Sequence, residues 1–197
     1  MRKLAVLIWL MIPVVAGAYH YGPGQKQLVL DEVALLVASA EAAVEDGDHS
    51  LAAVHYDKAF QLLPADRPNV SRRLRLERDK AWMLAKQLPE AHADLTNLVD
   101  EVTNDASVDP EFARQARATL ANSQYYMTWL MRLEGRPPED WEPVIDASRQ
   151  SLRMLAETDE ACADKVELKL YSEDLESAIR LARLDLKDLQ GLPLPSQ

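Results

Sequence analysis

From residue 25 onward, apolar residues recur every three or four positions, which is the period of an amphipathic helix. Residues 25–46 show the pattern clearly, with a stripe made of Val33, Leu36, Val37, Ala40, Ala43 and Val44. No segment alternates apolar and polar residues with the period of two that a half-buried strand requires. The pattern therefore predicts an all-α fold.

Proline, glycine and polar clusters divide this pattern into seven predicted helices. They cover residues 25–46, 49–63, 71–86, 89–103, 110–133, 139–157 and 165–190. Gly47 stands where a helix end favours a left-handed residue, the run 135–138 closes the fifth helix, and Pro89 and Pro110 stand in first helical turns. Because the connections are short, we expect a helical domain of stacked antiparallel hairpins over 25–190, followed by a loose tail over 191–197.

The segment 1–24 is predicted to be a targeting segment rather than part of the fold. Arg2 and Lys3 precede the uncharged apolar stretch 4–18, whose last three residues fit the small-x-small rule for signal peptidase. Extended to Tyr21, the stretch approaches the shortest helix that spans a bilayer, so a cleaved signal peptide and an uncleaved membrane anchor both remain open. In either case we expect an extracytoplasmic location, in the periplasm or cell envelope.

The segment 47–64 carries a characteristic spacing of turn, small and aromatic residues. Intervals of 5, 4, 3 and 5 separate Gly47, Ala52, Tyr56, Ala59 and Pro64. This spacing resembles the second half of a tetratricopeptide repeat, and Ala40 stands where the family places a small residue in the preceding helix. In such a hairpin the alanines let two helices approach closely, and proline ends the second one.

A second match to the tetratricopeptide pattern is weaker. Ala91 and Leu95 stand at the places that the small residue and the aromatic residue occupy in the first match. Lys86 stands where the turn glycine belongs, and Asp79 stands where the first helix takes a small residue. The second hairpin is therefore expected to be a degenerate repeat.

A third hairpin, around Gly135, departs further, because Asp140 and Trp141 occupy the place of the small residue. The resemblance covers about residues 33–99. It implies a right-handed α-solenoid of stacked hairpins, in which the long last helix serves as the capping element that repeat stacks require.

The resemblance also implies a binding groove. In this family the first helix of each hairpin lines a concave surface that usually holds a peptide or helix of another protein. The groove positions would be taken by Ala34, Val37, Glu41 and Val44 in the first repeat and by Arg73, Leu76, Lys80 and Met83 in the second. One subfamily clamps a C-terminal carboxylate with lysine and asparagine at the places of Val37 and Glu41, so that activity is not transferred.

The net charge of −10 argues against general nucleic-acid binding, which needs cations to replace phosphate counterions. Residues 67–86 are nevertheless locally basic, with Arg67, Arg72, Arg73, Arg75, Arg78, Lys80 and Lys86. They indicate either a site for an acidic segment or a solvated helix face with Arg73–Glu77 and Arg75–Asp79 pairs. The solvated face is favoured, because charged helix faces are common.

Catalytic and metal-binding motifs are not found in the sequence. No two histidines stand at i and i+4, and His55 and His92 fall at repeat positions that usually face solvent. The one cysteine, Cys162, cannot form an intramolecular disulfide or a cysteine-based metal site by itself. We therefore expect no enzymatic activity, no cofactor and no metal.

These observations favour a non-catalytic protein–protein interaction module, an adaptor or scaffold whose partner is another protein or a peptide segment. Membrane contact would come through the N-terminal segment if it is uncleaved. Two alternatives are an architectural subunit of an envelope complex or homodimer, and a helical small-ligand carrier or enzyme. An exposed, partly apolar groove would favour the adaptor, an apolar patch on the outer helices the architectural subunit, and a closed polar cavity the carrier.

Overall fold

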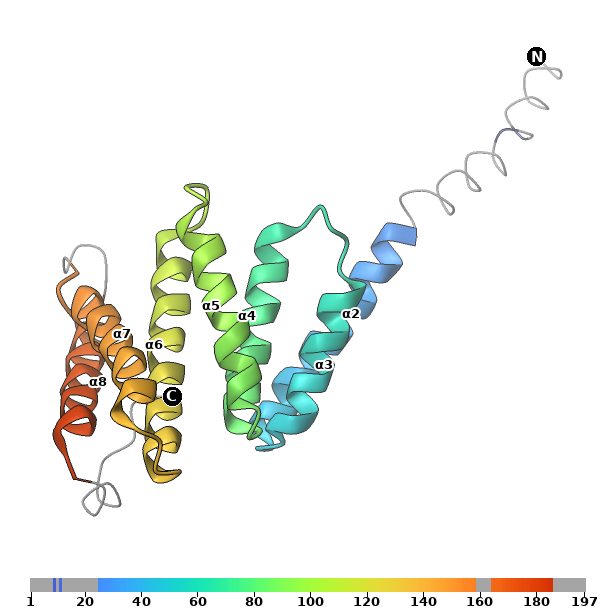
Figure 1. Cartoon of the computed structure of the whole chain (residues 1–197). Helices are drawn as coiled ribbons and strands as arrows, with labels where there is room; N and C mark the ends of the chain where they lie inside the picture. Colours follow the sequence, from blue (N-terminus) through green and yellow to red (C-terminus); the bar gives the residue numbers. More distant parts are fainter. Residues whose placement is uncertain (1–8, 10, 12–24, 159–163, 186–197) are drawn as a thin grey trace. The chain divides into compact units, whose positions relative to one another are not determined.

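The computed structural model describes residues 9, 11, 25–158 and 164–185, and these described residues form α-helices and no strand. The helices are α2 (Gln25–Glu45), α3 (His49–Leu62), α4 (Pro68–Leu84), α5 (Leu88–Thr103), α6 (Pro110–Leu133), α7 (Pro138–Ala156) and α8 (Lys165–Arg183) (Figure 1). The predicted all-α fold is confirmed. The predicted targeting segment, apart from residues 9 and 11, and the predicted tail lie outside the described residues.

The chain divides into two compact units, residues 1–74 and 75–197, with the boundary inside α4. In the first unit α2 packs against α3. In the second unit α5 packs on α6, α6 on α7 and α7 on α8. Packing between consecutive helices is what a stack of antiparallel hairpins requires, so this part of the prediction is also confirmed.

The same tight turn follows α2, α4 and α6. Its central residue is left-handed in each case, with φ of 76° at Gly47, 64° at Lys86 and 72° at Gly135. The next amide donates to a carbonyl five residues back, from Asp48 to Ala43 (2.8 Å), from Gln87 to Trp82 (2.9 Å) and from Arg136 to Met131 (2.9 Å). These are Schellman motifs, which satisfy the carbonyl groups that a helix end leaves unpaired. Lys86 thus has the same left-handed backbone conformation as Gly47 and Gly135.

The two helices of each hairpin contact one another through buried residues that stand at constant sequence distances from these turns. The residue seven places before each turn is fully buried, and it is Ala40, Asp79 or Thr128. The residue five places after the first two turns is a fully buried alanine, Ala52 or Ala91. Alanine leaves room for close packing at Ala40, Ala52 and Ala91, whereas Asp79 stands at the corresponding place of α4, as the sequence shows.

The third hairpin is shifted by one residue. Whereas α3 and α5 begin two residues after the left-handed residue, α7 begins three residues after Gly135. Three of its buried residues, Ile145, Ser148 and Leu152, accordingly stand one place later than the equivalent positions in α5. The Ser148 hydroxyl donates to the carbonyl of Ala121 in α6 (2.8 Å). This extra residue explains why Asp140, at the expected place of a small residue, is exposed.

Two helix ends differ from the prediction by three residues or more, and the others by at most two. α4 begins at Pro68 rather than Ser71, because proline suits the first helical position and the Ser71 amide already donates to the Arg67 carbonyl. α8 ends at Arg183, and Leu184 is extended with ψ of 147°, whereas the predicted helix includes 184 and 185; its remaining predicted residues lie outside the described range.

Arg132 of α6 accounts for the end of α8. Its buried guanidinium donates to the carbonyl groups of Leu181 and Leu184, and it lies 4.7 Å above the ring of Trp141 in α7. A cation at a helix C-terminus satisfies unpaired carbonyl groups and opposes the negative end of the helix dipole. One side chain therefore connects α6, α7 and α8.

We predict that Arg132→Met lowers the free energy of unfolding by about 3 kcal/mol, because two hydrogen bonds from a charged donor are lost. Amide hydrogen exchange should speed up over residues 165–185 in particular. The control is Arg136→Met, which removes only an exposed pair with Asp140 and should change stability by less than about 0.5 kcal/mol. Equal effects of the two substitutions would contradict this role for Arg132.

The left-handed turns give a second prediction. Lys86→Gly should raise the free energy of unfolding by about 1 kcal/mol, because glycine adopts positive φ without steric cost. Gly47→Ala should lower it by a similar amount, although a Cβ atom at Gly47 would meet no atom within 4 Å. Urea unfolding measures both, with Lys86→Ala as the control that removes the charge but keeps a Cβ atom. A loss of stability in Lys86→Gly would show that the turn is not strained.

Candidate functional site

The predicted groove residues are distributed over both units. On α2, Glu41 and Val44 are exposed and Val37 is half-buried. On α4, Arg73 is exposed in the first unit, whereas Lys80 and Met83 belong to the second. The structure thus places the three α2 candidates along one helix face.

In the second unit, the apolar members of the predicted groove contribute to the core. Leu76 is buried in a cluster with Leu95, Leu98, Val102, Phe112, Ala116 and Leu120, and Met83 packs against that cluster. The expectation that Leu76 lines a groove is therefore wrong, because its side chain is covered by residues of α5 and α6. Lys80 remains half-buried and pairs with Glu77 on its own helix (2.8 Å).

An apolar surface that the sequence analysis missed lies on α2. Leu28, Leu35, Ala38 and Ala42 are exposed and follow one another at helical spacing; we call them the outer stripe. Leu28 is 56% exposed and Leu35 is 71% exposed, the highest value among the large apolar residues of α2 to α8. The buried residues of α2, Val33, Ala40 and Ala43, lie on a different face. The signal was present in the sequence, since Leu28 and Leu35 fall outside the stripe that predicted the helix.

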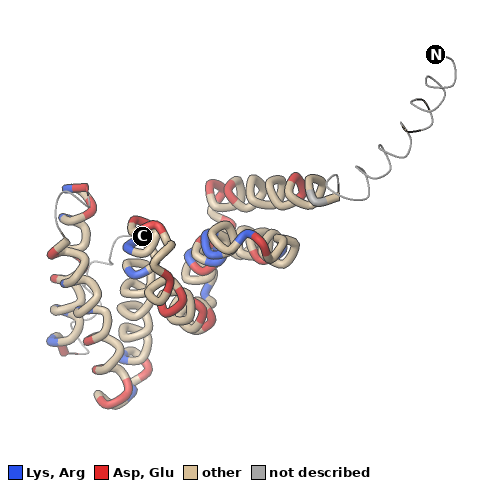
Figure 2. The backbone as a smooth tube through the Cα atoms, turned by 90° about the horizontal axis from the view of Figure 1, so that it is seen from above, with Lys and Arg blue, Asp and Glu red and all other residues tan. Residues whose placement is uncertain are grey.

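One acidic side chain interrupts the outer stripe and another follows it. Asp31 lies between Leu28 and Leu35 on the same helical row, and Glu45 continues that row beyond Ala42. Both are exposed. No lysine or arginine occurs between residues 29 and 45, and Figure 2 accordingly shows α2 with red and tan segments along this stretch. The stripe is therefore an apolar surface in a negative electrostatic environment.

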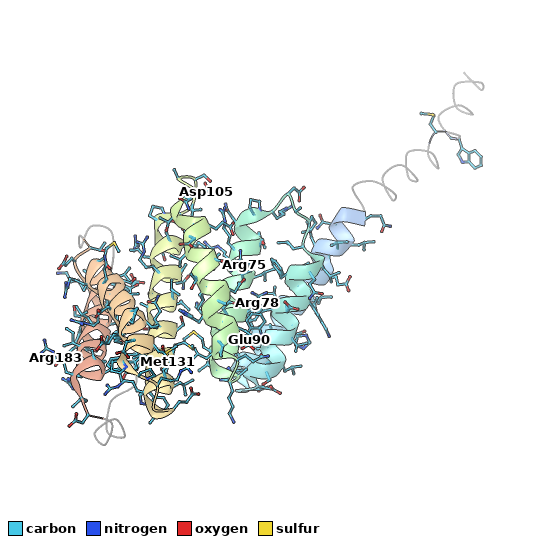
Figure 3. The ribbon with its side chains drawn as sticks, in the orientation of Figure 1. Arg75, Arg78, Glu90, Asp105, Met131 and Arg183 are labelled. Carbon is cyan, nitrogen blue, oxygen red and sulfur yellow. The ribbon has the colours of Figure 1, made fainter. Side chains whose placement is uncertain are left out.

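A partly buried ionic cluster joins α4 to α5 within the second unit, and Figure 3 labels its two arginines, Arg75 and Arg78. Arg75 binds Asp94 through two parallel hydrogen bonds of 3.1 Å and reaches Glu101 at 2.8 Å. Arg78 binds Asp94 at 2.7 Å and lies 4.1 Å above the ring of Trp82. The predicted solvated face with an Arg75–Asp79 pair is wrong here, because Arg75 pairs with Asp94 and Glu101 on α5 and Arg78 is buried.

Asp79 is the most deeply buried member of this cluster, with 0% of its surface exposed. Its Oδ1 accepts hydrogen bonds from Arg78 at 3.0 and 3.2 Å, whereas Oδ2 is buried and accepts none. Burial, followed by the negative charge of Asp94, raises the pKa of Asp79 to about 8 despite the opposing effect of Arg78. The raised pKa and the side-chain hydrogen bond between Asp79 and Asp94 indicate that Asp79 is the protonated donor of this pair.

Asp94 remains the charged partner in this pair. Burial disfavours its charge, but hydrogen bonds from Arg75 and Asp79 and the two guanidinium charges lower its pKa overall. The two carboxyl groups thus differ in protonation because their surroundings differ. Asp79 and Asp94 together connect α4 to α5. Asp79 stands seven residues before its turn, at the place that Ala40 occupies in the first hairpin.

His92 and Ser123 form another polar contact, between α5 and α6, with 3.1 Å from Nδ1 to Oγ. The Ser123 hydroxyl also lies 2.7 Å from the Leu120 carbonyl, so the direction of its bond with Nδ1 follows from the tautomer of His92. Ser123 itself is fully buried. The expectation that His92 faces solvent is wrong: it is half-buried, and burial lowers its pKa.

Comparison with known proteins finds no matching family model, no matching curated protein and no matching solved structure. Among the described residues, no helix is both long enough and apolar enough to cross a membrane. The same residues contain no group of three or more histidine, cysteine or carboxylate side chains placed to hold a metal ion. Cys162 lies outside the described residues.

The Asp79 carboxyl group gives a pH prediction. Because its pKa rises from 3.8 when exposed to about 8 in the fold, the folded state holds an extra proton between these values. Asp79 therefore stabilises the fold at low pH, and this contribution is lost as pH rises toward 8. Asp79→Asn keeps a neutral donor toward Asp94 and should abolish this part of the pH dependence.

The measurement is urea unfolding of wild type and Asp79→Asn at pH 5, 6.5 and 8. His92 acts in the opposite direction below its ordinary pKa of 6.5, since its pKa is lowered in the fold. The difference between the two proteins cancels this effect, because both contain His92. We expect the stability of wild type relative to Asp79→Asn to fall steadily with pH. A constant difference would contradict a protonated Asp79.

Proposed function

We propose that the chain is a non-catalytic protein-interaction module, an adaptor or scaffold built from tetratricopeptide-like hairpins and acting on the extracytoplasmic side of a membrane. The observation that carries this proposal is the outer stripe of α2. Exposure of Leu28 and Leu35 to water does not stabilise the helix, and a row of exposed apolar side chains commonly marks a binding site.

Local geometry supports the repeat-like part of the proposal. The turns at Gly47, Lys86 and Gly135 have the same left-handed conformation and the same hydrogen bond. In the first hairpin Ala52, Tyr56 and Ala59 are buried, as the tetratricopeptide pattern requires. Arrays of such hairpins present helix faces to partners, which fits a protein whose exposed helix face is apolar.

The proposed location depends on the sequence of the segment 1–18. Two cations, an uncharged apolar stretch and a small-x-small end form the pattern of a secretory signal. The same segment, left uncleaved, would tether the helical part to the membrane surface. In both cases the hairpins would meet their partner outside the cytoplasm.

An architectural subunit is the second candidate, and α3 favours it. Leu51, Val54 and Leu62 are exposed on one face of this second helix of the first hairpin. A surface of that kind on an outer helix would suit permanent burial in one assembly. The two functions differ in which face of the hairpin contacts the partner.

Photo-crosslinking of the full chain in the cells that produce it tests the proposal. A photoreactive residue at position 35 should form an adduct with one discrete protein, because Leu35 projects from the outer stripe. Position 169 on α8 is the control, since its lysine side chain is 77% exposed and lies far from α2 in the sequence. An adduct from position 54 alone would favour the architectural subunit, and adducts from none of these positions would contradict an interaction module.

A further inference from the structure

The outer stripe has the dimensions of a docking site for one helix. From Leu28 to Glu45 its row follows spacings of three and four residues, as Leu28, Asp31, Leu35, Ala38, Ala42 and Glu45. This alternation is the pattern with which one helix packs along another. Leucine side chains project at one end, and the two alanines allow close approach of a second helix at the other.

Charge identifies the kind of helix that would fit. The only charged residues in this row are Asp31 and Glu45, and both are acidic and exposed. Their positions in the sequence place them about four helical turns apart, which corresponds to about 21 Å along a helix. A partner helix that covers Leu35, Ala38 and Ala42 would therefore meet a carboxylate at each end of the contact.

We propose that the outer stripe binds an amphipathic helix of another protein that has basic residues about four turns apart, one facing Asp31 and the other facing Glu45. This inference rests on the proposed interaction function and specifies the chemistry of the partner. Opposite charges at the two ends of an apolar contact fix the register of the helices and exclude partners with acidic residues there.

The same charges argue against two other occupants. A second copy of this chain, docked through its own α2, would place acidic residues against acidic residues. An anionic membrane surface would be repelled by Asp31 and Glu45, whereas helices that lie on such membranes are rich in lysine and arginine. The basic helix of a different protein is the occupant that satisfies both the apolar and the charged positions.

Binding of designed peptides to the full chain tests the proposal. Three Ala-rich peptides, each about six helical turns long, share one leucine and alanine face and differ only at two positions about four turns apart. These two positions are both lysine, both glutamine or both glutamate. Fluorescence anisotropy should show the lysine peptide binding about tenfold more tightly than the glutamate peptide, with the glutamine peptide between them. Added salt should reduce the difference.

Matched variants of the protein complete the test. Asp31→Lys with Glu45→Lys should reverse the order of the peptides, while Asp100→Lys with Glu142→Lys, an equal charge change at exposed sites on α5 and α7, should preserve it. Leu35→Glu should abolish binding of all three peptides. Equal binding of the peptides to wild type would overturn the charge selection and leave the interaction function standing.

Other outcomes would overturn the proposal more broadly. Failure of all three peptides to bind, together with no adduct from position 35 in cells, would remove the interaction function as well. If sedimentation shows that the wild type is a dimer and that Leu35→Glu is a monomer, the occupant of the stripe is a second copy of this chain. Binding to vesicles with anionic lipid that is lost in the same variant would assign it to a membrane.

Discussion

Each hairpin depends on the reversal of the chain at one residue in the left-handed conformation. At Gly47 and Gly135 this conformation has no steric cost, whereas at Lys86 it is imposed on a residue with a Cβ atom. Once the turn is formed, the residues seven places before it and five or six places after it are brought to the contact between the two helices. The choice of side chains at those places then decides how each hairpin is held together.

The first two hairpins differ in the side chains that fill the contact between their helices. In the first, alanines such as Ala40 and Ala52 let the helices meet through small apolar side chains. In the second, Asp79 occupies the place of Ala40 and takes part in a network with Arg78 and Asp94. A buried network of this kind tolerates few alternative alignments, because any shift would leave a charge unpaired. The second hairpin thus keeps the turn geometry of the first, while the contact between its helices is ionic and is predicted to respond to pH.

The sequence predicted the helices well, because proline and glycine mark most of their ends. It failed where the deciding partner is distant in the chain. The end of α8 depends on Arg132, which is far from Leu181 in the sequence, and the partner of Arg75 and Arg78 is Asp94 on the next helix. The sequence of one helix shows only the acidic residues four places from each arginine on that helix. It therefore predicts a solvated face for the basic segment. The outer stripe was missed for another reason, since the family resemblance places the groove at Val37, Glu41 and Val44, on a different face of the helix.

Amide hydrogen exchange at Asp48, Gln87 and Arg136 tests the equivalence of the three hairpins most directly. These amides follow the three left-handed residues and donate the hydrogen bonds that close the turns. We predict that all three are protected from exchange, and that Gln87 is protected although its turn contains lysine instead of glycine. Rapid exchange at Gln87 beside protected amides at Asp48 and Arg136 would show that the second turn is open, and would contradict a repeated hairpin.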